Sequence, residues 1–153
     1  MDKVEFKEYL FQGGVYVTNF RIERDASRVY SLFFFTCNLK GLHKMLDAFW
    51  KMDSSRGQGY SVNQQPMLLT EAELSGYPAK LYHFLASDPL KTNGEVYKFG
   101  LEQGFLPKFT AKYLRQWQKE KKLNVIPSDG QAMRPNAFYL DNPKRHIVFQ
   151  IVA

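Results

Sequence analysis

The segment from Pro107 to Lys122, PKFTAKYLRQWQKEKK, constrains the fold most, because as a helix it can bury only one side. At about 100° per residue, its apolar face consists of Phe109, Thr110, Tyr113, Leu114 and Trp117. Five basic residues at helical spacing fall within an arc of roughly 80° on the other side: Lys108, Lys112, Arg115, Lys119 and Lys122. Like charges one turn apart repel each other. We therefore expect this row to face a negatively charged partner, with Glu120 pointing away from it.

The positive charge of the chain is concentrated in its C-terminal part. Residues 1–90 contain ten Lys or Arg and ten Asp or Glu, whereas residues 91–153 contain eleven and five. The whole net charge of +6 therefore lies in the last part of the chain. Such a local excess is better evidence for an anionic partner than a high isoelectric point alone.

The composition favours a soluble, cytoplasmic protein. With 153 residues, 44 % of them apolar, the chain suits one ordinary domain, or one domain with a small subdomain. Cys37 is the only cysteine, so neither an internal disulfide nor a Cys-based metal cluster can form, and we expect a buried, inert thiol. The N-terminus lacks the features of a signal peptide. No apolar run approaches the ~18–20 residues of a membrane helix, so we expect no membrane partner.

The first third of the chain has the pattern of an antiparallel β-meander. Strands are expected at Val4–Phe11 and Val15–Glu23, on either side of the turn signal Gly13-Gly14. A further strand is expected at Val29–Thr36, after a turn at residues 25–27. Because this last strand is apolar on both faces, we expect it in the centre of the sheet.

A helix should follow the sheet and pack on it. Asn38 is a good N-cap for the segment LKGLHKMLDAFWKMD. Its apolar stripe consists of Leu42, Met45, Leu46, Phe49 and Met52. Residues 54–66 are polar and contain glycines, which indicates an exposed loop. We therefore divide the chain into a sheet-and-helix subdomain, 1–66, and a second domain, 67–153.

The second domain has the element order of a winged helix-turn-helix. Residues 67–74 are ambiguous, but Pro78 suits the start of a helix to about Ser87, and Thr92–Glu95 matches a capping box. The basic helix follows, and strands are expected at 123–126, 137–140 and 147–152. In a winged helix-turn-helix the last helix enters the DNA major groove, and a two-stranded ribbon, the wing, lies over the adjacent backbone.

These elements define the candidate nucleic-acid contacts. The wing, expected from Asn124 to Tyr139, places three polar residues near its tip. A row dominated by lysine binds phosphates more than it reads bases, so we expect sequence-tolerant binding of double-stranded DNA. The candidate binding residues are Lys108, Lys112, Arg115, Gln116, Lys119, Lys122, Gln131, Arg134 and Asn136.

Two stretches also resemble a known family. FFFTCNLKGLHKMLDAFWKMD at 33–53 resembles the signature of the C-terminal region of three-Cys-motif partner proteins, and YLRQWQKEKKLNVI at 113–126 is similar to the winged-helix part of that region. The resemblance covers nearly the whole chain. It implies a domain that usually follows an N-terminal methyltransferase-like domain, which would be the enzyme in longer relatives. Nothing in this chain corresponds to that domain, so its activity and cofactor do not carry over.

The chain contains no motif for catalysis or for a cofactor. GxGxxG, GxxxxGK[ST] and GxSxG are all missing, and the three histidines are isolated from other metal ligands. We therefore expect an α+β protein that is no enzyme and needs no metal or cofactor. We expect it to be the DNA-targeting module of a nucleic-acid-modifying protein. Two alternatives stay open: a protein-interaction module that docks a catalytic partner, and a merely solvated basic face. The oligomeric state stays open too.

Overall fold

The computed structural model describes residues 14–25, 27–54, 57, 59–61 and 75–152, and the chain divides into two units, 1–74 and 75–153. Each unit is described separately. The predicted boundary at residue 66 lies outside the described residues, as do the predicted strand at 4–11 and the ambiguous segment 67–74.

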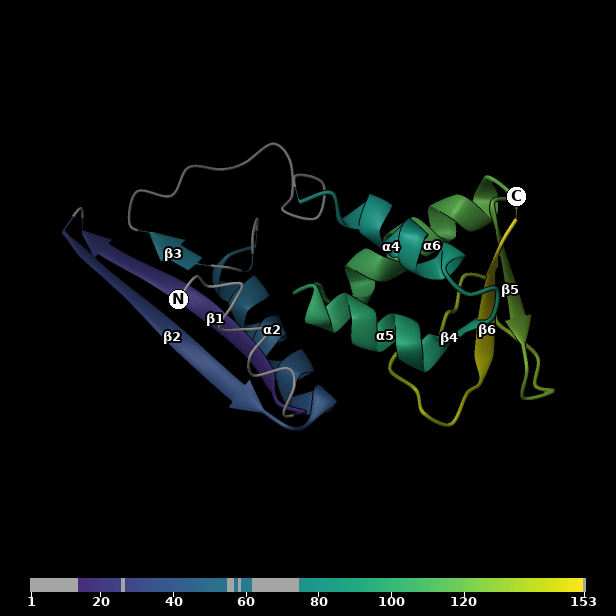
Figure 1. Ribbon diagram of the computed structural model, residues 1–153, viewed down its shortest axis with the longest axis horizontal. Coiled ribbons are helices and arrows are strands. Elements are labelled where there is room, and N and C mark those ends of the chain that lie inside the picture. Colours follow the sequence, from purple (N-terminus) through teal and green to yellow (C-terminus); the bar gives the residue numbers. More distant parts are fainter. Residues whose placement is uncertain (1–13, 26, 55–56, 58, 62–74, 153) are drawn as a thin grey trace. The chain divides into compact units, whose positions relative to one another are not determined.

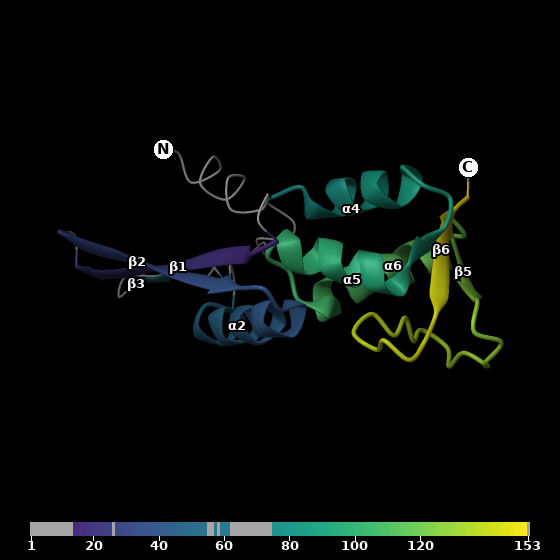
Figure 2. The same ribbon diagram turned by 60° about the horizontal axis from the view of Figure 1, so that its bottom comes forward.

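The first unit is a small sheet with one helix on it. Strands β1 (Tyr16–Asp25) and β2 (Arg28–Thr36) form an antiparallel hairpin, and β3 (Gly59–Ser61) pairs with β1 in parallel. The hairpin turns at Asp25, whose Oδ1 accepts hydrogen bonds from the amide and the hydroxyl of Ser27. Helix α2 (Leu39–Met52) covers one face of the sheet (Figure 2).

The core of this unit lies between α2 and β1. Asn38 caps α2 as predicted, because its side chain accepts a hydrogen bond from the Lys40 amide (2.8 Å). Phe20 of β1 stacks on Phe49 of α2 with ring centroids 4.8 Å apart. Two expectations about burial are wrong: Met52 is 54 % exposed, and Cys37 is exposed just after β2.

Strand β2 does not lie in the centre of the described sheet, whose strand order is β2-β1-β3. Five of its large apolar side chains are about half exposed: Val29, Tyr30, Leu32, Phe33 and Phe35. The prediction of a strand covered on both faces is therefore wrong for the described residues. The apolar pattern correctly predicted that this segment is a strand, but it could not predict which strands lie beside it.

The second unit is a three-helix bundle with a small sheet. The helices are α4 (Tyr77–Ala86), α5 (Asn93–Glu102) and α6 (Pro107–Lys119), and they lie together on one side of the strands (Figure 1). The strands are β4 (Lys91–Thr92), β5 (Leu123–Pro127) and β6 (Ile147–Ile151), antiparallel in the order β4-β6-β5. The predicted α+β class and the winged helix-turn-helix order are confirmed.

Local signals set the helix boundaries of this unit. The capping box is present, because the Thr92 hydroxyl accepts from the Glu95 amide and the Glu95 carboxylate accepts from the Thr92 amide. The hydrogen bonds that the amide and the hydroxyl of Thr92 donate to the Glu95 carboxylate lower the pKa of Glu95. Gly104, at φ +90°, closes the turn after α5, and Pro107 occupies the first turn of α6.

Residues 137–140 do not form the predicted strand. The partner of β5 is β6, so the wing is the β5–β6 pair with a long loop, residues 128–146, between the strands. The short strand β4, which pairs with β6, was not predicted from the sequence.

Candidate nucleic-acid interface

Helix α6 is fixed in orientation by its apolar face. Leu114 is fully buried, and Trp117, 8 % exposed, packs edge-on against Tyr82 of α4 with ring centroids 5.3 Å apart. The buried Thr110 hydroxyl shares a 2.6 Å hydrogen bond with the hydroxyl of Tyr77 on α4. These contacts confirm the predicted apolar face of the helix, with Trp117 in the core.

The opposite face of α6 is polar and mostly basic. Five candidate residues lie exposed on it: Lys108, Lys112, Arg115, Gln116 and Lys119. The ammonium groups of Lys108 and Lys112 lie 5.1 and 5.6 Å from the ring centroids of Phe109 and Tyr113. No carboxylate among the described residues forms an ion pair with Arg115 or Lys119. Those two charges are therefore available to an anion.

The basic row ends one turn earlier than the sequence predicts. Helix α6 stops at Lys119, and Lys121 adopts the left-handed conformation (φ 59°). The Lys121 amide donates to the Gln118 carbonyl (3.1 Å) and the Lys122 amide to the Trp117 carbonyl (2.9 Å), which is a Schellman motif. Lys122 is exposed but belongs to the turn before β5, so its predicted place on the helix is wrong.

Glu120 contacts two of the candidate residues, contrary to the prediction that it points away. Its carboxylate accepts from Gln116 Nε2 (2.9 Å) and from Lys122 Nζ (2.7 Å). The hydrogen bond from Lys122 is the main cause that lowers the pKa of Glu120, and the bond from Gln116 adds to it. The pairing with Glu120 also raises the pKa of Lys122. A phosphate that binds Lys122 therefore competes with this carboxylate for the ammonium group.

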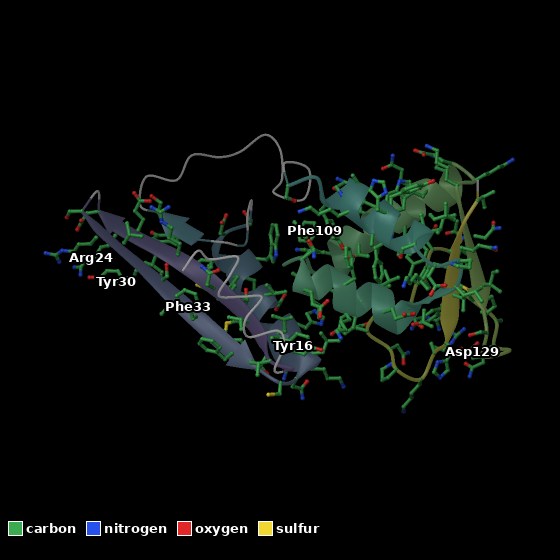
Figure 3. The ribbon with its side chains drawn as sticks, in the orientation of Figure 1. Tyr16, Arg24, Tyr30, Phe33, Phe109 and Asp129 are labelled. Carbon is green, nitrogen blue, oxygen red and sulfur yellow. The ribbon has the colours of Figure 1, made fainter. Side chains whose placement is uncertain are left out.

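The other three candidates lie in the loop of the wing. Gln131, Arg134 and Asn136 are all exposed there. Asp129, labelled in Figure 3, lies near the start of this loop and pairs with Arg145 near its end. Arg145 Nε donates to Asp129 Oδ2 at 2.7 Å, and the two side chains are only 10 % and 7 % exposed.

Asp129 also binds the backbone on both sides of the loop. Its Oδ1 accepts from the Gln131 amide and its Oδ2 from the His146 amide, both at 3.0 Å. The hydrogen bond from Arg145 is the main cause that holds the pKa of Asp129 well below its usual range, and the two backbone hydrogen bonds add to it. The guanidinium of Arg145 lies over the ring of Tyr139, 4.2 Å from its centroid.

A buried asparagine joins the far side of the loop to the helices. Asn93, 4 % exposed at the start of α5, donates from Nδ2 to the carbonyls of Tyr139 (2.8 Å) and Arg145 (3.1 Å). Its Oδ1 accepts from the Ile147 amide (3.2 Å). The sequence places Asn93 only in the capping box, and no pattern in it points to a role for Arg145 or Tyr139. For Asp129 one signal is available, because Asp129-Gly130 is typical of a turn.

The described residues show neither a metal-binding cluster nor a membrane-spanning helix. No three His, Cys, Asp or Glu side chains among them lie close enough together to hold a metal ion. None of the helices in the described part of the chain is both long and apolar enough to cross a membrane.

A family model described as the GMT-like wHTH domain matches residues 53–130, half of the chain. The match includes α4, α5, α6 and β5, whereas most of the wing loop and β6 lie beyond it. The search of curated proteins and the search of solved structures found no match.

Proposed function

Because the chain belongs to the family of GMT-like wHTH domains, we propose that it binds double-stranded DNA through α6 and the wing loop. The observation that carries this proposal is the position of the basic face. It lies on the last helix of the winged helix-turn-helix order, which enters the major groove in proteins of this architecture. Its apolar side is held in the core, so the basic side must face outward.

The residues divide into two roles. Lys108, Lys112 and Arg115 are the candidate cations nearest the N-terminus of α6, where groove contacts concentrate, and Gln116 follows Arg115. Beyond them, phosphates would be held by Lys119, Lys122 and Arg134, while Gln131 and Asn136 add polar contacts from the wing. Because lysines outnumber arginines on α6, we infer that binding tolerates many sequences.

Fluorescence anisotropy of labelled duplex DNA, single-stranded DNA and RNA tests the proposal. We expect the duplex to bind most tightly, and Lys112→Ala and Arg115→Ala each to weaken it about five- to tenfold at 0.1 M salt. Lys44→Ala is the matched control, since it removes one exposed positive charge from α2. Equal losses in all three variants, or no duplex binding by the unaltered chain, would refute the proposal.

The wider role follows from the resemblance to three-Cys-motif partner proteins. We infer that this chain is not itself the enzyme and that it targets a nucleic-acid-modifying domain to DNA in the cytoplasm. The absence of catalytic motifs in the sequence supports this role. An assay for methyl transfer to bound DNA, with and without a methyltransferase-like domain of a longer relative, tests it. Activity of this chain alone would contradict it.

Strand β2 supports a second candidate function, docking of a catalytic protein partner. It lies at the edge of the described sheet, and Tyr30 and Leu32 are 53 % and 54 % exposed. Tyr30 and Phe33 are labelled along it in Figure 3. A long, apolar edge strand is a ready template for the addition of another strand. If Leu32→Lys abolished binding of a catalytic partner while the α6 variants left duplex affinity unchanged, docking would replace DNA binding as the function.

A further inference from the structure

The wing loop is long and irregular, yet its conformation is fixed at several points. Residues 128–146 contain no helix or strand, and structureless connections of this length in small domains are usually functional. Asn136 and Tyr139 have positive φ angles of 59° and 48°. Asparagine adopts this conformation readily, but a bulky residue such as Tyr139 keeps it only where its surroundings impose it.

Three contacts hold Tyr139 in this left-handed conformation. Its carbonyl accepts from Asn93, its ring lies against the Arg145 guanidinium, and its hydroxyl oxygen is 3.4 Å from the Arg134 amide, which donates to it. Asp129 in turn holds Arg145 by the 2.7 Å hydrogen bond. A continuous chain of contacts thus runs from Asp129 through Arg145 and Tyr139 to the backbone of Arg134.

We propose that Asp129, Arg145 and Tyr139 are positioning residues that hold the wing loop in its DNA-binding conformation, so that Arg134 meets a phosphate without ordering the loop first. This inference rests on the proposed function. Pre-ordering a loop raises affinity because the entropy of fixing it is lost on folding and not on binding.

Arg145 is not itself a phosphate ligand in this arrangement. Its side chain is 10 % exposed, and its Nε already donates to Asp129. Asp129 places a carboxylate in a loop that would face polyanionic DNA. Simple charge repulsion makes such a residue unfavourable for binding, whereas a positioning role makes it favourable. The two roles therefore differ in the sign of the effect that its neutralisation should have.

The test uses the full chain and labelled duplex DNA at several salt concentrations. Asp129→Asn removes one negative charge, so electrostatics alone would tighten binding. We expect instead that it weakens binding about three- to tenfold. The slope of log affinity against log salt should become shallower by about 0.9, the value of one phosphate contact. Arg145→Lys leaves the net charge unchanged but loses the planar group over Tyr139, and it should weaken binding in the same way.

A double-mutant cycle with Arg134→Ala separates positioning from a general loss of stability. In the Arg134→Ala background, Asp129→Asn should no longer weaken binding and should tighten it slightly, since only its charge effect is left. Additive losses would overturn the inference, as would unchanged or tighter binding by Asp129→Asn and Arg145→Lys in the otherwise unaltered chain. Failure of the unaltered chain to bind duplex would instead refute the proposed function.

Discussion

The contact between α5 and α6 leaves no room for a side chain at Gly100. A Cβ there would lie 2.7 Å from the Thr110 hydroxyl oxygen and 3.0 Å from that of Tyr77, the two atoms that share the buried hydrogen bond. Thr110 is 1 % exposed and Tyr77 is fully buried, so neither side chain can move into solvent. Gly100→Ala must therefore displace the contact that sets the rotation of α6.

The expected cost follows from three opposing contributions. Overpacking a filled core costs about 1–3 kcal/mol, and disturbing a buried hydrogen bond costs about 1 kcal/mol more. Alanine in place of glycine within a helix returns roughly 1 kcal/mol. We expect Gly100→Ala to lower the free energy of unfolding by about 1–3 kcal/mol.

Gly94→Ala is the matched control, because it is the same substitution in the same helix. A Cβ at Gly94 would have nothing within 4 Å, so alanine should be neutral or stabilise by up to about 1 kcal/mol. Urea unfolding followed by tryptophan fluorescence, with hydrogen exchange of α4 and α6, measures both variants. Equal effects of the two substitutions would refute the packing described for α6.

Three further outcomes follow from the same unit. Trp117→Ala should destabilise it by about 3–5 kcal/mol, and a near-native melting curve would mean that α6 is rotated. Glu120→Ala should tighten duplex binding roughly two- to fivefold at low salt, because Lys122 loses its competing carboxylate; unchanged or weaker binding in the anisotropy titration would contradict this. Burial raises the pKa of Tyr77 to about 12, above the value of about 10 in the unfolded chain. Its contribution to stability is therefore present below about pH 10 and is lost as pH rises toward 12, and Tyr77→Phe should flatten the unfolding free energy between about pH 10 and 12.

Local signals in the sequence were sufficient for the helices of the second unit. The capping box at Thr92, the glycine at Gly104 and the proline at Pro107 each act within a few residues, so they could be read without knowing the fold. The end of α6 lacked such a signal. Lys121 takes the left-handed position that glycine usually occupies, and the sequence therefore predicted a helix that continued to Lys122.

Pairing between distant segments was harder to predict. Phe138 and Leu140 are 4 % and 5 % exposed, so they have the alternating burial that is typical of a strand. The carbonyl between them, that of Tyr139, is bound by Asn93 and not by a neighbouring strand. The Asn93 side chain, 46 residues away in the sequence, thus donates the hydrogen bond that a neighbouring strand was expected to donate. The same difficulty explains β2, whose apolar faces indicated a central strand without showing what lies beside it.

The side chains that support the candidate site could not be predicted from the sequence. All nine candidates are exposed, as contact with DNA requires. Asp129 and Arg145, which hold the wing loop, lie 16 positions apart in the sequence, at the two ends of the loop that joins the paired strands β5 and β6. No spacing rule for a single helix or strand could have brought them together.

The salt dependence of duplex affinity tests the central proposal most directly. Three or four phosphate contacts from α6 and Lys122, with one from the wing, should make the logarithm of affinity fall with log salt at a slope of about −3.6 to −4.5. Lys112→Ala and Arg115→Ala should each reduce that slope by about one unit, and Lys44→Ala should leave it unchanged. A slope near zero, or one that neither α6 variant alters, would show that the basic face of α6 does not bind the DNA backbone.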